Sequence, residues 1–302
     1  MSPTPRRVRA LAERGFEPMR GLRFPLARLM TASIVHDALA EDAADDDITT
    51  IASVVSDRRA RGAIVARESG VIAGIPLARE AFRQRDPHAS VRAAVRDGQR
   101  VAAKTLVIFV TSRARSLLSA ERVALNFMQH LSGIATLTAN YVDAIKGTGA
   151  RILDTRKTTP GWRRLEKYAV RAGGGLNHRM HLASAVLIKD NHLSAVDGDV
   201  ELAVRRAREM APAGTAIEVE CDTLDQVRSA LVADVDVIML DNMSLDELRR
   251  AVELVNGRAV VEASGGVTLA RVRAIAETGV NWISVGALTH SARALDLALD
   301  FE

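Results

Sequence analysis

The chain has 302 residues, of which 48% are hydrophobic, 26% charged and only 3% aromatic, with a formal net charge of +4. This length and apolar content allow two domains with real cores and exclude global disorder, while the lone Cys221 excludes a disulfide framework and a cysteine-based zinc site. Because the longest apolar runs cannot span a bilayer and the N-terminus lacks an apolar signal region, we expect a soluble cytoplasmic protein that binds no membrane.

The positive charge is concentrated at the N-terminus. Residues 1–30 contain seven Arg and two Glu, which leaves 34 of the 41 basic and 35 of the 37 acidic residues for the rest of the chain. A nucleic-acid-binding protein needs basic charge clustered on its folded body, so we expect no nucleic-acid partner. We interpret residues 1–25 as a flexible, solvated extension in preference to an RNA-binding arm or a transit peptide.

Residues 26–130 are predicted to form an α+β, sandwich-like domain with a mostly antiparallel sheet. Residues 31–48 predict a helix followed by an acidic loop, and the spacing of apolar residues over 116–145 predicts a long helical connector. Short β-type runs separated by turn signals, with a helix over 77–85 between two of them, predict strands at 63–66, 71–74, 91–95 and 105–110.

The pattern changes after Gly147, and residues 131–288 are predicted to form an α/β barrel. Six apolar runs are each followed by a polar residue and a helical stretch, at 151–154, 185–189, 216–220, 235–241, 259–264 and 282–286. Six such βα units in a row favour parallel strands that close into a barrel, although a doubly wound open sheet has the same spacing. We expect a final helix over 289–302 that packs on the N-terminal domain.

Polar residues gather where these strands end, which is where α/β proteins bind ligands. Ser264, Gly265, Gly266 and Gly286 end the last two strands and could expose backbone N–H groups to a phosphate; the alternative is a tight turn without a ligand. The run 173–175, Gly-Gly-Gly, is either a mobile substrate loop or a helix stop.

Two carboxylates and several cations complete this set. Glu220 and Asp241 end neighbouring strands and could hold Mg²⁺ or accept from sugar hydroxyls; the alternative is a salt bridge to Arg. The cations are Arg156, Lys157, His178, Arg179 and Lys189. So many positive groups would repel one another without an anion between them, which indicates substrates rich in carboxylate and phosphate.

The motifs themselves resemble the quinolinate phosphoribosyltransferase family. The resemblance covers about residues 30–302 and rests on motifs in one order, at 121–136, 154–161 (DTRKTTPG), 166–179, 188–192 (IKDNH), 218–220, 239–242 (MLDN), 262–266 (EASGG) and 285–290 (VGALTH). Several long motifs in sequence make a specific signal. Within this fold the nearest competitor is the molybdenum-operon paralog, and a phosphosugar sensor without activity is the non-enzymatic alternative.

The resemblance implies an N-terminal α/β sandwich, an incomplete α/β barrel of about six strands, and a homodimer as the minimal active unit. The implied reaction joins quinolinate to phosphoribosyl pyrophosphate and yields nicotinate mononucleotide, pyrophosphate and CO₂ with Mg²⁺ and no organic cofactor. We expect a dissociative reaction, in which Glu220 or Asp241 stabilises the positively charged ribose.

The resemblance also assigns roles to individual residues. Arg156, His178 and Arg179 resemble the binders of the quinolinate carboxylates, and Arg122 resembles an arginine contributed across the dimer interface. Lys157 and Lys189 resemble groups that face carboxylate and pyrophosphate, and these two lysines with Glu220 and Asp241 are the expected catalytic residues, the two acids also forming a possible Mg²⁺ site. The remaining expected substrate contacts are Thr155, Ser264, Gly265, Gly266, Val285, Gly286, Ala287 and His290.

Overall fold

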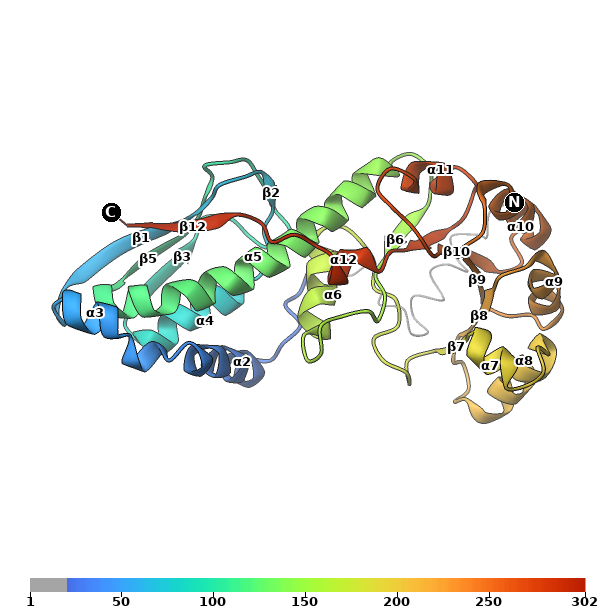
Figure 1. Ribbon diagram of the computed structural model, residues 1–302, viewed down its shortest axis with the longest axis horizontal. Coiled ribbons are helices and arrows are strands. Elements are labelled where there is room, and N and C mark those ends of the chain that lie inside the picture. Colours follow the sequence, from blue (N-terminus) through green and yellow to red (C-terminus); the bar gives the residue numbers. More distant parts are fainter. Residues whose placement is uncertain (1–20, 302) are drawn as a thin grey trace. The chain divides into compact units, whose positions relative to one another are not determined.

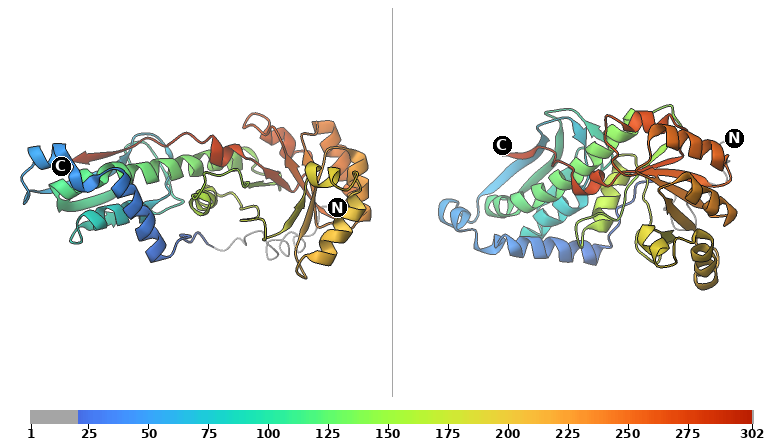
Figure 2. Two further views of the ribbon diagram at one scale, coloured as in Figure 1. Left: turned by 60° about the horizontal axis from the view of Figure 1, so that its bottom comes forward. Right: turned by 45° about the vertical axis from the view of Figure 1, so that its right-hand side comes forward.

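The computed structural model describes residues 21–301, so most of the extension expected over residues 1–25 lies outside the described residues. The chain divides into two compact units (Figures 1 and 2). The first unit comprises Leu22–Ala139, Pro160–Gly174 and Ser291–Glu302, and the second contains Asn140–Thr159 and Gly175–His290. In this division, residues 131–139 and 160–174 belong to the first unit. Within residues 21–301, no helix is long and apolar enough to cross a membrane.

The first unit is an α+β fold around a four-stranded antiparallel sheet. The strand order is β12-β1-β5-β3, and a separate two-stranded ribbon pairs β2 with β4. The strands are β1 (Arg59–Ala66), β2 (Gly70–Val71), β3 (Ser90–Ala93), β4 (Arg100–Val101), β5 (Leu106–Arg113) and β12 (Leu297–Phe301). The helices are α2 (Arg28–Glu41), η1 (Ala44–Asp46), α3 (Ile48–Ser53), α4 (Ile75–Arg85), α6 (Arg163–Ala172) and the first part of α5 (Ala114–Ala144). The predicted α+β class and the long connecting helix are confirmed.

The prediction of a helix over residues 289–302 is wrong. Only Ala287–His290 is helical (α12), and the chain then forms β12, which pairs antiparallel with β1 from Gly62↔Phe301 to Ala66↔Leu297. An isolated helix this short is marginal in water, whereas the free edge of β1 offers a row of backbone hydrogen bonds. Long-range pairing therefore overrides the local helical propensity.

The run of glycines at 173–175 follows a helix end. Helix α6 ends at Ala172 with Gly173 as its C-cap, which agrees with the helix-stop interpretation. A Cβ on Gly173 would lie 2.3 Å from the carbonyl oxygen of Ala135 on α5. Gly173 therefore also permits a close approach of two backbones that any side chain would prevent.

The second unit is a six-stranded parallel sheet with the order β6-β11-β10-β9-β8-β7. Its strands are β6 (Arg151–Leu153), β7 (Val186–Ile188), β8 (Ile217–Cys221), β9 (Val237–Asp241), β10 (Val260–Ser264) and β11 (Trp282–Ser284). Its helices are α7 (Asp190–Ser194), α8 (Val200–Met210), α9 (Leu224–Val232), α10 (Leu245–Val255), α11 (Val272–Ala276) and α12. Figure 2 shows the helices that follow β7 to β10 along one side of the sheet.

The strand order decides between the two architectures that the spacing left open. From β7 to β11 each strand pairs with its successor, and the first strand, β6, pairs with the last. A doubly wound sheet would reverse its order at a switch point, whereas this cyclic order is that of a barrel. The described strands leave β6 and β7 unpaired with each other, and Leu176 instead bridges to Leu153 of β6. The barrel is therefore incomplete, as predicted.

Local sequence explains why the outer helices begin where they do. Thr223 and Ser244 are the N-caps of α9 and α10, and in both cases the residue three positions on, Gln226 or Glu247, completes a reciprocal capping box. Such caps satisfy backbone N–H groups that a helix leaves unpaired. These caps define where the loops after β8 and β9 end. Those loops follow the carboxyl ends of the strands, where α/β proteins bind ligands.

Candidate active site

The inward-facing side chains of the barrel form three layers, because alternate residues of a strand point to the same face. The lowest layer is an apolar cluster with one residue from each strand or its entry, namely Leu153, Ala185, Ala216, Val237, Val260 and Trp282. Two residues further along, the middle layer is mixed: Leu187, Glu218, Met239, Glu262 and Ser284. Two residues further again, the upper layer is Lys189, Glu220, Asp241, Ser264 and Gly286. The polar site thus lies above an apolar floor.

A cavity of about 670 Å³ opens above these layers in the second unit. It is lined by all the expected site residues of this unit, namely Thr155, Arg156, Lys157, His178, Arg179, Lys189, Glu220, Asp241, Ser264, Gly265, Gly266, Val285, Gly286, Ala287 and His290. It is also lined by residues that sequence reasoning did not select, namely Leu187, Met239, Asn242, Glu262, Val267 and Ser284. The tertiary structure therefore brings one predicted set together from six strand ends.

Arg122 is the expected site residue that this cavity does not include. It lies on α5 in the first unit, its side chain is exposed, and it is not among the described residues that line the cavity. An arginine that serves the active site of a second subunit would be exposed in one chain. Its role across a dimer interface stays a prediction.

Arg179 and Arg156 are the clearest anion-binding pair. Arg179 is only 6% exposed, and its Nη1 donates to the carbonyl oxygen of Ala185 at 3.0 Å. Burial and, after it, the nearby Arg156 guanidinium lower the pKa of Arg179, although Glu218 acts in the opposite direction. Two neighbouring guanidinium groups repel, so an anion that binds between them is favoured.

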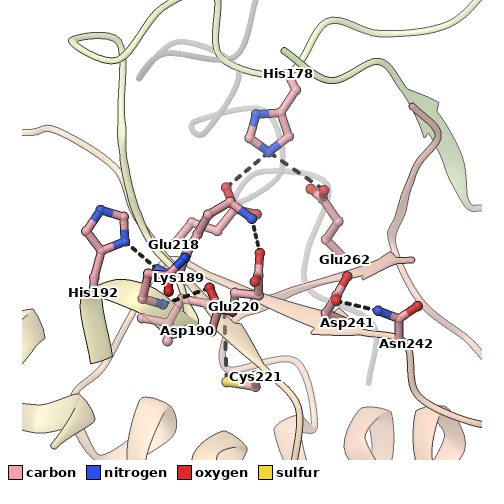
Figure 3. Close-up of polar contacts among 12 residues, drawn as sticks. His178, Lys189, Asp190, His192, Glu218, Glu220, Cys221, Asp241, Asn242 and Glu262 are labelled. Atoms are coloured by element: carbon pink, nitrogen blue, oxygen red, sulfur yellow. Dashed lines mark hydrogen bonds and ion pairs between the residues drawn. The ribbon is translucent and has the colours of Figure 1, made fainter. Parts of the chain in front are cut away.

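Lys189 and Glu220 form an ion pair across adjacent strand ends (Figure 3). The Lys189 side chain is 43% exposed and that of Glu220 only 9% exposed, so the carboxylate is the buried partner. The backbone N–H of Lys189, the N-cap of α7, donates to Nδ1 of His192 in the first turn of that helix. The salt-bridge alternative for Glu220 is therefore partly realised, with a lysine in place of an arginine.

Asp241 is oriented by its neighbour. Asn242 has a left-handed backbone with φ 55°, and its Nδ2 donates to Asp241 Oδ2 at 2.6 Å. Gly265 has φ +84°, and a Cβ there would lie 2.2 Å from Asn242 Oδ1. Gly265 is therefore required both by its own backbone and by the amide that packs on it.

Gly286, which follows strand β11, lies close to the side chain of Lys157. A Cβ on Gly286 would lie 3.1 Å from Lys157 Cδ and 3.2 Å from His290 Nε2. Thr289 Oγ1 donates to the carbonyl oxygen of Lys157 at 2.7 Å. The helices after the two glycine sites, α11 and α12, have only five and four residues, so a helix dipole contributes little there. Anion binding would depend on the backbone N–H groups, Lys157 and His290.

A buried acidic cluster lies in the middle layer below the cavity rim. His178 Nε2 is 3.1 Å from Glu218 Oε2 and 3.7 Å from Glu262 Oε1 (Figure 3). Burial and, after it, Glu218 raise the pKa of Glu262 to about 8. Burial likewise raises the pKa of Glu218 to about 8, although Arg179 and Lys189 oppose the rise. These carboxyl groups therefore tend to hold protons near neutral pH.

The sequence contained a signal for these missed acids. Glu218 stands two residues before Glu220, and Glu262 two residues before Ser264, so each shares a strand face with a predicted site residue. A charged residue at an inward position in the middle of a barrel strand is unusual. A prediction based on the strand ends alone therefore misses Glu218 and Glu262, which lie one layer deeper.

Comparisons with known proteins agree with this geometry. Residues 47–132 match the family model for the N-terminal domain of quinolinate phosphoribosyl transferase, and residues 134–300 match the model for its C-terminal domain. The probable nicotinate-nucleotide pyrophosphorylase [carboxylating] of Synechocystis is 46% identical over 264 residues, covering 86% of this chain and 89% of that protein. The nicotinate-nucleotide pyrophosphorylase [carboxylating] of Mycobacterium leprae is also 46% identical, covering 84% of this chain and 90% of that protein.

A solved structure shows the same fold. The crystal structure of nicotinate-nucleotide pyrophosphorylase from Ehrlichia chaffeensis superposes with a TM-score of 0.85 at 43% identity, covering 90% of this chain and 98% of that one. Two family models together match well over half of the chain, in the order of the domains. With its incomplete six-stranded barrel and its cation-rich cavity, this chain belongs to the quinolinate phosphoribosyl transferase family.

Proposed function

We propose that this chain transfers the phosphoribosyl group of phosphoribosyl pyrophosphate to quinolinate with loss of CO₂, giving nicotinate mononucleotide and pyrophosphate for NAD biosynthesis. The observation that carries this proposal is the order of side chains around the cavity rim. Around the sheet, Gly286 follows β11 and Ser264 ends β10, Asp241 and Glu220 lie at the ends of β9 and β8, and Lys189 follows β7. The two carboxylates thus lie between two kinds of anion-binding group. On one side are glycine loops suited to a phosphate, and on the other side are cations suited to further anionic groups of the substrates.

This order matches the chemistry of the two substrates. The 5-phosphate would bind at the glycine loops with Lys157 and His290, and the ribose would lie beside Asp241 and Glu220. The two carboxylates of quinolinate would bind Arg156 and Arg179. Such fixed charges act most strongly in a cavity that excludes bulk water, and they orient both substrates for reaction.

The reaction is proposed to be dissociative. The C1–O bond of the ribose breaks and pyrophosphate leaves with the electron pair, so positive charge develops on the ribose beside Glu220 and Asp241. The pyridine nitrogen of quinolinate then donates its lone pair to C1. The positively charged ring accepts the electron pair left when the bond from C2 to its carboxylate breaks and CO₂ leaves, and C2 takes up a proton.

The donor set of the cavity fits Mg²⁺. This ion prefers oxygen ligands and is usually held by one or two carboxylates together with substrate phosphates. Glu220 and Asp241 supply such oxygens at adjacent strand ends, although Lys189 shares Glu220. When bound, the ion would neutralise charge on the pyrophosphate. The homodimer and the cytoplasmic location stay predictions.

The proposal is tested by incubating the purified protein with quinolinate, phosphoribosyl pyrophosphate and Mg²⁺, and by measuring CO₂ and nicotinate mononucleotide. A parallel reaction replaces quinolinate with nicotinate. We expect turnover only with quinolinate, because two guanidinium groups provide more positive charge than one carboxylate needs. Comparable turnover with nicotinate, or none with quinolinate, would contradict the proposal and favour a paralogous activity.

A further inference from the structure

Asp154 is a buried carboxylate that follows β6 and directly precedes the site segment 155–157. Its side chain is 0% exposed, and it is not among the described residues that line the cavity. Leu153 belongs to the inward-facing apolar layer, and successive residues of a strand point to opposite faces. Asp154 therefore acts on the site only through other residues.

The Asp154 carboxylate holds the chain where it returns to the site. Its Oδ1 accepts from the backbone N–H of His178 at 2.9 Å, and its Oδ2 accepts from Nδ2 of Asn177. The backbone N–H of Asp154 also donates to the carbonyl oxygen of Leu176 at 3.1 Å. Asp154 thus binds three consecutive residues that lead directly to Arg179.

These bonds join the two segments that carry the guanidinium groups of the site. Arg156 lies two residues after Asp154, and Arg179 lies two residues after Asn177. The chain between the two segments contains α6, which belongs to the first unit, so the sequence does not by itself bring the arginines together. The Asp154 carboxylate is therefore a direct side-chain link between the two segments.

The two arginines oppose this proximity when no anion is bound. Burial and, after it, the Arg156 charge lower the pKa of Arg179, as expected for two cations that repel. A substrate with two carboxylates fixed on one ring needs the two guanidinium groups at one separation. A protein that holds them there before the substrate arrives avoids the entropic cost of ordering them on binding.

We propose that Asp154 is a positioning residue that holds the segments of Arg156 and Arg179 together, so that both guanidinium groups are preorganised for a substrate with two carboxylates on a rigid ring. The inference rests on the proposed function only for the identity of that substrate, quinolinate. The bond to His178 uses its backbone N–H and leaves the imidazole for the substrate. Lys157 depends less on this link, because Thr289 Oγ1 donates to its carbonyl oxygen.

The first test is the kinetics of Asp154→Asn. An amide has one acceptor oxygen and one NH₂ group, so either the His178 N–H or the Asn177 amide loses its acceptor. We expect KM for quinolinate to rise about tenfold, because the cost of ordering the two segments then falls on quinolinate binding. We expect kcat and KM for phosphoribosyl pyrophosphate to change by less than about threefold. Equal rises in both KM values, or a fall in kcat at unchanged KM for quinolinate, would overturn the inference.

Exchanging the two side chains tests the link itself. In the double variant Asp154→Asn/Asn177→Asp, the amide at position 154 can donate to the carboxylate at position 177, while its oxygen still accepts from the His178 N–H. Asn177→Asp alone sets two carboxylates against each other. We expect each single exchange to raise KM for quinolinate and the double variant to recover most of the loss. Additive losses would contradict a direct link.

Asp86→Asn is the matched control, because Asp86 is a buried aspartate of the first unit that also accepts from a side chain and from the backbone. It should lower stability and leave both KM values unchanged. A rise in KM for quinolinate equal to that of Asp154→Asn would attribute the effect to stability and overturn the inference. If Asp154→Asn fails to fold, Asn177→Ala removes only the side-chain bond and should still raise KM for quinolinate, by a smaller factor. An unchanged KM in that variant would equally overturn the inference.

The last test needs no activity. Amide hydrogen exchange of the substrate-free protein reports on both segments, because the N–H groups of Lys157 and His178 are hydrogen-bonded in the wild type. We expect Asp154→Asn to exchange faster over 155–158 and 175–179 together, with no change over α10. Faster exchange in one segment alone, or in neither, would contradict the inference. Absence of quinolinate turnover in the wild type would instead refute the proposed function and leave this measurement to decide the role of Asp154.

Discussion

Gly265 shows how the absence of one side chain sets the position of another. A Cβ at this residue would lie 2.2 Å from Asn242 Oδ1 and 2.8 Å from the Asn242 backbone nitrogen. The Asn242 amide is also the donor to Asp241 Oδ2. A methyl group at residue 265 would therefore displace the group that orients a predicted catalytic carboxylate.

We expect Gly265→Ala to lower kcat/KM for phosphoribosyl pyrophosphate by at least about tenfold and to destabilise the fold by about 1–3 kcal/mol, because a side chain is strained at φ +84°. Gly214→Ala is the matched control, since Gly214 has φ +83° and no atom within 4 Å of an added Cβ. It shares the backbone strain without the contact. Steady-state kinetics and thermal unfolding of both variants check the prediction, and equal catalytic losses would contradict it.

The two upper-layer carboxylates allow a separate prediction. Glu220→Ala and Asp241→Ala should each lower kcat by about 100-fold or more, as loss of a transition-state charge partner usually does. Stability should change little, because the Lys189 side chain that loses its partner in Glu220→Ala is 43% exposed and can be hydrated. Kinetics and urea unfolding of the same preparations measure both effects. Near-normal rates in both variants would contradict a catalytic role and indicate that these acids only form salt bridges.

At the scale of elements, Asp86 ties the end of helix α4 to strand β5. Its carboxylate accepts hydrogen bonds from Ser112 Oγ at 2.8 Å, from the Arg113 N–H at 3.1 Å and from the His88 N–H at 3.0 Å. Burial alone would raise the pKa of Asp86, but these hydrogen bonds and the Arg113 charge lower it to about 2. The carboxylate is thus stabilised in its charged form.

The sign of the resulting pH dependence follows from this shift. A pKa of about 2 in the folded state lies below the ordinary value of 3.8, so Asp86 stabilises the fold above pH 3.8 and loses that contribution as pH falls toward 2. Urea unfolding of the wild type and of Asp86→Asn at several pH values tests this. We expect the difference in unfolding free energy between the two proteins to be largest near neutral pH and to shrink below pH 4. A difference that stays constant with pH would contradict the assignment.

At the scale of the whole molecule, the active site is expected to need two chains. The cavity in the second unit contains every expected site residue of that unit, while Arg122 is exposed on α5 in the first unit. The family resemblance places this arginine in the site of a partner subunit. Neither Arg122→Ala nor Lys189→Ala should then be active alone, although both should remain folded and dimeric.

Mixing these two inactive variants should restore activity. In a mixed dimer one site lacks both groups and the other is intact, so random subunit exchange would return roughly one quarter of wild-type activity, with half of the dimers mixed and half of their sites complete. CO₂ release after exchange measures the recovery, and native mass spectrometry of tagged chains verifies the heterodimers. No recovery in verified heterodimers would place Arg122 in its own chain's site or outside any site.

Periodicity in the sequence was sufficient to locate the six βα units and the residues at their strand ends. The spacing of apolar runs and the polar residues that follow them are short-range properties, and they survive in the structure as β6 to β11 and as the upper layer of the cavity. Parallel strands carry their carboxyl ends to one edge, so Lys189, Glu220 and Asp241 converge whatever the details of packing.

Long-range contacts decided what the sequence alone left open. The segment 297–301 became β12 because β1 offered a free edge, and local propensity carries no information on that edge. The cyclic strand order, which distinguishes a barrel from an open sheet, exists only once β6 pairs with β11. Glu218, Glu262 and His178 come from three separate segments, and only the pairing of the strands and the return of the chain over them bring their polar atoms within 4.8 Å of one another. The sequence by itself determined the strand-end chemistry, and tertiary structure decided which buried groups support it.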